Sequence, residues 1–195
     1  MFYAKKVIFL ILVIILILTG CKEEVAHYGI EAIGPSFDTL QEMEDYSSTI
    51  VCVTRENIET PIVKVSREEM VTGYTFSQVK IKEIFKDTSN ELKIGDTIRI
   101  LENEIFYEEE NAIYHIAGYN MMVEGKEYLL FLTDHIYEDN NPYYVAAGVN
   151  YGTVSLEEDN RTTVYLTRNG NQVNDFSEMQ PIWDEALHKY ANKEK

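Results

Sequence analysis

Residues 71–85 read VTGYTFSQVKIKEIF, and this stretch decides the fold class of the chain. Tyr74 and Phe76 fall on one face of an extended strand, whereas Val79 and Ile81 have the opposite parity. A long strand that switches its apolar face midway usually contains a bulge, here near Ser77–Gln78. Because bulges let a strand bend and serve two sides of a barrel, the stretch predicts a curved, barrel-like β structure.

The segments around this strand share its β-branched and aromatic character and are separated by turn residues such as Gly95–Asp96 and Asn169–Gly170. Tyr128–Leu132 is apolar on both faces and is therefore expected to be a central strand. Glu102–Asn111 is acidic and is expected to be a long loop or an excursion at the edge of a sheet. The remaining predicted strands are Thr49–Thr54, Thr97–Leu101, Ala112–Val123, Tyr143–Val149, Thr153–Leu156 and Thr162–Thr167.

A helix is expected at each end of this β region. Apolar residues recur at helical spacing from about residue 36 to residue 46, after a possible N-cap at Ser36. Near the C-terminus, Ser177–Gln180 resembles a capping box, and apolar residues including Trp183 then recur with a helical period over 177–192. The predicted fold is mainly β, with a short N-terminal helix and a C-terminal helix.

Composition limits the function classes. The chain has 195 residues, with 33 acidic and 17 basic side chains and a formal net charge of -16. This length predicts one domain, and the 45% apolar content is too high for a disordered chain. The acidic surface argues against nucleic-acid partners. Two cysteines cannot build a disulfide scaffold or a four-cysteine metal site.

The N-terminus has the layout of a secretory signal peptide. Lys5 and Lys6 precede the unbroken apolar run Val7–Leu18, which is followed by Thr19–Cys21. The run is shorter than the roughly 20 residues that span a bilayer, and Lys22–Glu24 cannot extend it. Residues 1–20 are therefore expected to be a leader.

The tetrad Leu18-Thr19-Gly20-Cys21 resembles the lipobox of bacterial lipoproteins. That resemblance implies cleavage between Gly20 and Cys21, a diacylglycerol on the Cys21 sulfur and an acyl group on its amine. Several acyl chains together hold a protein lastingly in a membrane. The implied location is the extracytoplasmic face of the cell membrane; the alternative is an uncleaved signal anchor with Cys21 as a bystander.

Cleavage would remove Lys5 and Lys6, which lowers the basic count from 17 to 15 and takes the net charge from -16 to -18. Such a chain is repelled by anionic lipid, so the lipid anchor alone would hold it, and the globular part is expected to stand off the surface. Residues 21–35 are predicted to be a lipidated tether. Residues 36–195 are predicted to form a single barrel-like domain.

Residues 74–132 carry a second resemblance. The strand Tyr74–Ile81, the Gly95–Asp96 turn and the segment Gly125–Leu130 are similar to the netrin-like barrels, which include the tissue inhibitors of metalloproteinases. The layout is also similar to uncharacterised lipoproteins of Gram-positive bacteria. The resemblance implies an OB-like five-stranded barrel. The inhibitory chemistry is not implied, because it needs a free N-terminal cysteine and Cys21 would be lipidated.

Catalytic signatures are absent from the sequence. It contains no nucleophile elbow, P-loop, dinucleotide fingerprint or zinc-protease motif. His27 falls in the predicted tether and His188 on the terminal helix, while His115 is expected to be a half-exposed strand residue. Cys52 is expected to be a small buried strand residue rather than a nucleophile. No catalytic residue, metal ligand or cofactor is predicted.

The sequence predicts a lipid-anchored envelope protein that binds a protein partner or small ligand and catalyses nothing. Thirteen tyrosines remain after cleavage, and such residues enrich binding surfaces. One alternative is an envelope hydrolase with an unrecognised carboxylate site. The other is a cation-dependent module that uses Asp134–His135 and Glu138–Asp139. The oligomeric state is left open.

Overall fold

The computed structural model describes residues 24–66, 70–133, 136–138, 141–157, 165–173 and 176–191. The predicted leader, the lipidation site at Cys21, and three of the four proposed cation ligands, Asp134, His135 and Asp139, lie outside these residues. The described chain is mainly β, as predicted. None of its helices is long and apolar enough to cross a membrane.

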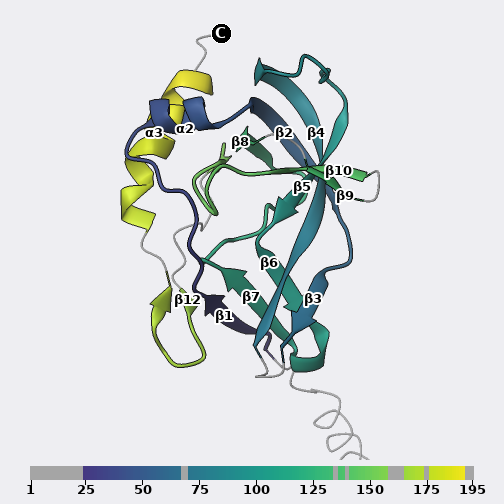
Figure 1. The fold of residues 1–195 in the computed structure, drawn as a ribbon, viewed down its shortest axis with the longest axis vertical. Coiled ribbons are helices and arrows are strands. Elements are labelled where there is room, and N and C mark those ends of the chain that lie inside the picture. Colours follow the sequence, from purple (N-terminus) through teal and green to yellow (C-terminus); the bar gives the residue numbers. More distant parts are fainter. Residues whose placement is uncertain are drawn as a thin grey trace, which may run out of the picture.

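The main sheet has eight strands and contains the long strand from which the fold class was predicted (Figure 1). Its order is β11-β8-β2-β4-β5-β10-β9, with β3 paired to β4, and all pairs are antiparallel except β5 with β10. The strands are β2 (Thr49–Ile58), β3 (Ile62–Val65), β4 (Val71–Asp87), β5 (Thr97–Glu102), β8 (Glu127–Leu132), β9 (Ile136–Glu138), β10 (Asn141–Val145) and β11 (Thr153–Ser155).

The pairing of the long strand β4 is irregular, as its switch of parity predicted, both near the predicted position and further along the strand. The register with β2 shifts three times along the pair. Two shifts place an extra residue in β4, at Lys82 and at Phe85, and the shift opposite Gln78 places it in β2, at Glu56. Phe76 and Ser77 point to opposite faces and are both buried, because both faces of the strand are covered at this level.

The predicted closed barrel is not confirmed. The main sheet ends at β11 on one side and at β9 on the other. One isolated antiparallel bridge, between Leu132 and Ala146, connects the end of β8 to the residue after β10. The central position predicted for Tyr128–Leu132 is confirmed, because β8 pairs with both β2 and β11 and all five residues are buried.

A second, three-stranded sheet packs below the main one (Figure 1) and has the order β1-β7-β6. Its strands are β1 (Ala26–Ile30), β6 (Glu104–Tyr107) and β7 (Ala112–Ile116), with the 3-10 turn η1 (Glu108–Glu110) between β6 and β7. The acidic segment predicted as a long loop or an edge excursion thus contains β6, which lies at the edge of this sheet. The segment predicted as a tether also contains a strand, since β1 pairs in parallel with β7. A short hairpin of β12 (Tyr165–Leu166) and β13 (Gln172–Val173) lies beside β1.

Two helices cover one side of the main sheet (Figure 1). Helix α2 (Leu40–Tyr46) begins later than predicted, because the Thr39 side chain caps it by accepting from the Glu42 N–H. Helix α3 (Gln180–Tyr190) follows the 3-10 turn η2 (Phe176–Glu178) and confirms the predicted C-terminal helix. The predicted capping box is wrong, since Met179 is the N-cap and makes no side-chain cap bond.

Three apolar clusters hold these layers together. The first lies between the helices and the sheet and includes Met43, Phe131 and Trp183. The second lies inside the bend of the main sheet, around residues such as Ile81. The third lies beneath the three-stranded sheet and includes Tyr114. The Trp183 Nε1–H also donates to the Tyr151 carbonyl at 3.0 Å, which fixes α3 to the loop before β11.

Candidate functional site

A surface groove among the described residues crosses β4, β5 and β10 and has a volume of about 410 Å³. Three adjacent strands supply most of its lining, so its floor is rigid backbone. The loop after β4 and the end of β2 supply the walls. The lining residues are Glu59, Gln78, Glu91, Leu92, Thr97, Ile98, Arg99, Asn141, Pro142 and Tyr144.

A fixed arginine lies in this groove. The Arg99 guanidinium donates from Nε to Glu59 Oε1 at 2.8 Å and from Nη2 to Glu59 Oε2 at 2.7 Å. Its Cζ atom lies 3.4 Å from the centroid of the Phe76 ring, so the guanidinium is also held face-on to an aromatic ring. Planar, bidentate pairing of this kind is characteristic of arginine. The pair neutralises both charges and leaves a rigid polar surface.

The rest of the groove combines polar side chains with apolar ones, such as Leu92 and Ile98, and bears little charge. Gln78 and Asn141 contribute amides, and Thr97 contributes a hydroxyl. Two carboxylates line the groove: Glu59 is paired with Arg99, and Glu91 is the other. Amides and hydroxyls both donate and accept hydrogen bonds. The surface can therefore bind a chain of neutral hydrogen-bonding groups and offers no concentration of positive charge for phosphates.

A buried carboxylate lies behind the groove, at the end of β5. Glu102 is fully buried and accepts from the Tyr119 hydroxyl at 2.9 Å, from the Met122 N–H at 2.7 Å and from the Ser77 hydroxyl. Arg55 Nε donates to the same Ser77 hydroxyl at 3.3 Å. Burial raises the pKa of the Glu102 carboxyl. These bonds fasten the segment after β7 to the main sheet.

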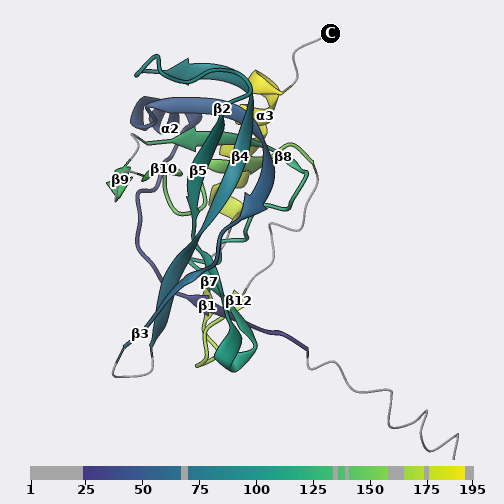
Figure 2. The same ribbon diagram turned by 90° about the vertical axis from the view of Figure 1, so that its right-hand side faces the viewer.

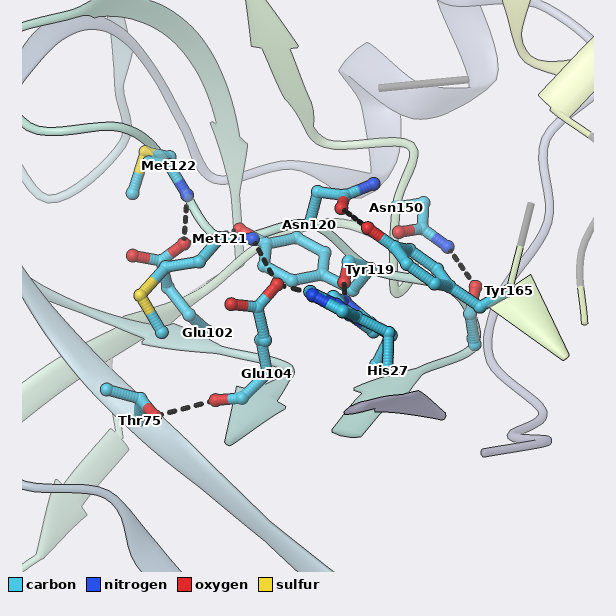
Figure 3. Close-up of polar contacts among 12 residues, drawn as sticks. His27, Thr75, Glu102, Glu104, Tyr119, Asn120, Met121, Met122, Asn150 and Tyr165 are labelled. Carbon is cyan, nitrogen blue, oxygen red and sulfur yellow. Dashed lines mark hydrogen bonds and ion pairs between the residues drawn. The ribbon is translucent and has the colours of Figure 1, made fainter. Parts of the chain in front are cut away.

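Next to this carboxylate lies a chain of imidazoles (Figure 3), which the sequence did not predict. His115 is buried, against the expectation of half exposure, and its Nδ1 lies 3.0 Å from Glu104 Oε2 and 2.9 Å from the Tyr119 carbonyl oxygen. Its Nε2 lies 2.9 Å from Nδ1 of His27. The ring of Tyr165 stacks on His115 with centroids 3.5 Å apart.

The contacts indicate which nitrogens carry protons. His115 Nδ1 faces two oxygen acceptors and therefore donates. In the neutral pair its Nε2 then accepts from the His27 Nδ1–H. The ring centroids lie 5.2 Å apart with planes 13° apart, which fits an in-line N–H···N bond.

The two imidazoles belong to no candidate metal site in the described residues. No group of three or more His, Cys, Asp and Glu side chains there could hold a metal ion. Neither His27 nor His115 lines the groove or the second large cavity, which has a volume of about 400 Å³ and lies between β1, the start of β4 and the β12–β13 hairpin. The bonds instead attach β1 to β7 and β6.

The remaining predicted residues are dispersed. Tyr144 lines the groove, whereas Tyr114, Tyr119 and Tyr151 are buried elsewhere, so these four side chains form no single surface. Cys52 is half-buried in β2, and burial together with the nearby Glu127 raises the pKa of its thiol to about 11. This agrees with a structural role.

No known protein family matches the chain, and no curated protein shows significant similarity to it.

Proposed function

We propose that this protein is a lipid-anchored binding module of the cell envelope, and that its ligand lies in the groove over β4, β5 and β10. The observation that carries the proposal is the groove itself, a concave surface of about 410 Å³ across three paired strands, with polar and apolar side chains and little net charge. Ligand sites of proteins are typically concave surfaces of roughly this size with a few fixed polar groups.

The strand arrangement supports an OB-like barrel. The path β2-β4-β5-β10 contains two antiparallel steps and then a parallel one, and the bridge between Leu132 and Ala146 leads back to β8, which pairs with β2. We propose that β2, β4, β5, β10 and β8 form a five-stranded barrel, which the Leu132–Ala146 bridge closes between β10 and β8. In OB folds the face of the second and third strands binds oligosaccharides or oligonucleotides. Here these strands are β4 and β5, which both line the groove.

The chemistry of the groove favours an uncharged polar chain, such as an oligosaccharide or an extended peptide. The Arg99–Glu59 pair supplies no free positive charge, and the chain as a whole has a net charge of -16. Both facts disfavour polyphosphate ligands, because nucleic-acid affinity comes chiefly from neutralised phosphates.

Attachment is proposed through Cys21, as the tetrad Leu18–Cys21 implies. A diacylglycerol on sulfur with an N-acyl group is enough for lasting attachment. The module would then act at the extracytoplasmic face of the membrane, where cell-wall glycans and exported proteins are available as ligands.

A hydrolase is the second candidate, and Glu102 is the observation that favours it. Carboxylates that work as general acids have pKa values raised by burial, and burial raises the pKa of Glu102. However, Glu102 lines neither large cavity, and its three hydrogen bonds all go to the protein's own groups. A substrate would therefore have no access to it, and binding without catalysis is the better proposal.

Ligand-observed NMR on the purified protein tests the binding proposal. The probes are cell-wall oligosaccharides and their stem peptides. Gln78→Arg places a long charged side chain in the groove, and Gln41→Arg makes the same change on the exposed face of α2. We expect saturation transfer to at least one probe, lost in Gln78→Arg and kept in Gln41→Arg. Transfer that is equal in the two variants would contradict the proposed site.

A further inference from the structure

The open edge of β5 forms one side of the groove. Successive side chains of a strand point to opposite faces of a sheet, so a surface over one face is lined by every second residue. Here three consecutive residues of β5, Thr97, Ile98 and Arg99, line the groove. The ladder between β5 and β10 covers Ile100 and Leu101, and no described strand pairs with residues 97–99 on that side. Figure 2 shows β10 and β9 beyond β5, on the side away from β4.

Pro142 explains why the pairing between β10 and β5 stops. The two strands are parallel, with Tyr144 opposite Ile100. Continued pairing would place residue 142 opposite Ile98, where its N–H would donate to the Thr97 carbonyl. Proline has no N–H, so β10 leaves β5 at this point, and its first residues pair with β9 instead.

The main chain of β5 directs hydrogen-bonding groups toward the groove. The Ile81 N–H of β4 donates at 2.9 Å to the carbonyl of the residue that precedes β5, so the main-chain groups of Ile81 face β5. Because the bonding direction alternates along antiparallel strands, Val79 also bonds to β5, where its partner is Ile98. The main-chain groups of Thr97 and Arg99 therefore face away from β4, toward β10 and the groove.

The side chains on the two faces of this edge differ in chemistry. Ile98 packs with Leu92 and the buried Tyr144 in the second apolar cluster. Arg99 lies on the other face, together with Gln78, its cross-strand partner in β4. A strand added at this edge would therefore place its side chains alternately in apolar and polar surroundings.

We propose that the groove binds an extended peptide of an exported protein, which adds to β5 as a strand with alternating apolar and polar side chains. The inference rests on the proposed function, because it takes the groove as the ligand site. In this mode of recognition, main-chain hydrogen bonds supply affinity and alternate side chains supply specificity. The outward main-chain groups of β5 recur every second residue, about 6.6 Å apart, which matches the repeat of a second peptide strand. An oligosaccharide has no main-chain N–H and C=O groups at this spacing.

Peptide titration of the purified, isotope-labelled full chain in detergent, followed by amide hydrogen exchange in NMR, tests the proposal. The probe is acetyl-KVSVQVK-amide, in which valines alternate with polar residues. The matched control, acetyl-KSQVVVK-amide, has the same composition without the alternation. Two further versions of the probe carry N-methyl groups, one on the three valines and the other on the serine and glutamine. Each version blocks the N–H groups along one edge of the added strand.

We expect the alternating peptide to bind more tightly than the control. Exchange of the Thr97 and Arg99 amides should become about tenfold slower at a peptide concentration of about ten times Kd. The Ile98 amide, which faces β4, is the internal reference and should change little. One N-methylated version should lose binding and the other should keep it, because only one edge of the peptide faces β5.

Equal binding by the alternating and control peptides, equal effects of the two methylated versions, or no binding at millimolar peptide would each overturn strand addition. Protection of other amides in place of Thr97 and Arg99 would put the peptide elsewhere and also overturn it. Cell-wall oligosaccharides, titrated in the same way, separate this inference from the proposed function. Chemical shift changes in the groove with an oligosaccharide alone would refute the added strand and keep the groove as the ligand site. No change there with either kind of probe would refute both.

Discussion

The Nδ1 atom of His27 lies 2.9 Å from the Nε2 atom of His115, a residue 88 positions later in the chain. This bond joins a strand that begins five residues after the proposed lipidation site to the buried polar centre of the domain. Together with the pairing of β1 with β7, it attaches β1 to the rest of the fold.

Removing either imidazole should weaken the attachment of β1, by different amounts. His115→Ala leaves the buried Tyr119 carbonyl without its imidazole donor and should lower the free energy of unfolding by about 2–4 kcal/mol. The exposed His27 contributes one bond, so His27→Ala should cost about 1 kcal/mol. Urea unfolding and hydrogen exchange of the β1 amides measure both effects. A double variant whose loss equals the sum of the two single losses would show that the pair is not coupled.

Stability should depend on pH through Glu102. Burial raises the pKa of this carboxyl, so the native state keeps the proton to a higher pH than the unfolded chain does. The stabilisation is fully present below the unfolded pKa of about 4.3 and is lost as pH rises through the folded pKa. Glu102→Gln cannot ionise and should flatten this fall.

The measurement for Glu102 is the free energy of unfolding in urea from acidic to alkaline pH. The difference between wild type and Glu102→Gln isolates this group from the other carboxylates. Glu124→Gln, in an exposed turn, is the matched control and should leave the pH profile unchanged. Parallel profiles for wild type and Glu102→Gln would show that Glu102 does not titrate as described.

The thiol of Cys52 should be slow to react. Burial and the neighbouring Glu127 raise its pKa from 9.0 to about 11, and the thiolate is the reactive form. At pH 8 we expect alkylation by iodoacetamide to be about a hundredfold slower in the native protein than in urea, because the thiolate fraction falls about tenfold for each unit of pKa. Equal rates in the two conditions would place Cys52 in a reactive, exposed setting.

The C-terminal helix should be essential for stability. Trp183 is buried against α2 and β8, and its indole N–H donates to the Tyr151 carbonyl at 3.0 Å. Trp183→Ala should lower the free energy of unfolding by about 3–5 kcal/mol. Trp183→Phe keeps most of the apolar contact and loses the hydrogen bond, so about 1–2 kcal/mol is expected. Far-UV circular dichroism in urea measures both, and similar losses in the two variants would assign the effect to the hydrogen bond.

The sequence predicted those elements whose own residues show an unbroken apolar run or a clear helical period. The apolar run Tyr128–Leu132 has no polar face to present to water, which allows only a central strand. Trp183 and its neighbours follow a helical period, so the terminal helix was recognisable. The boundaries of both helices were less predictable, since Thr39 rather than Ser36 caps the first and no side chain caps the second.

The first strand was not predictable, because its sequence AHYGI contains a glycine and lies in a polar stretch. Its stability comes from a partner strand 86 residues away in the chain, with Ala26 opposite Ala112. Gly29 is needed there because a Cβ atom would lie 2.7 Å from the side chain of Val173. Neither the distant partner strand nor the close approach of Val173 to Gly29 can be recognised from local periodicity.

The groove was not predictable either. Arg99, Glu59 and Phe76 come from β5, the residue after β2 and β4, and only the paired strands bring them together. In the sequence each reads as an ordinary surface or core residue. The same holds for His27, Glu104 and His115, which belong to β1, β6 and β7.

In-cell photo-crosslinking from the groove tests the central claim most directly. A benzophenone amino acid replaces Gln78 in the groove or, as control, Gln41 on α2, in the otherwise native, anchored chain, and mass spectrometry identifies the products. A binding module predicts a defined adduct at position 78 that is absent at position 41 and is lost when Cys21→Ala removes the anchor. Identical products at both positions, or none at position 78, would contradict it.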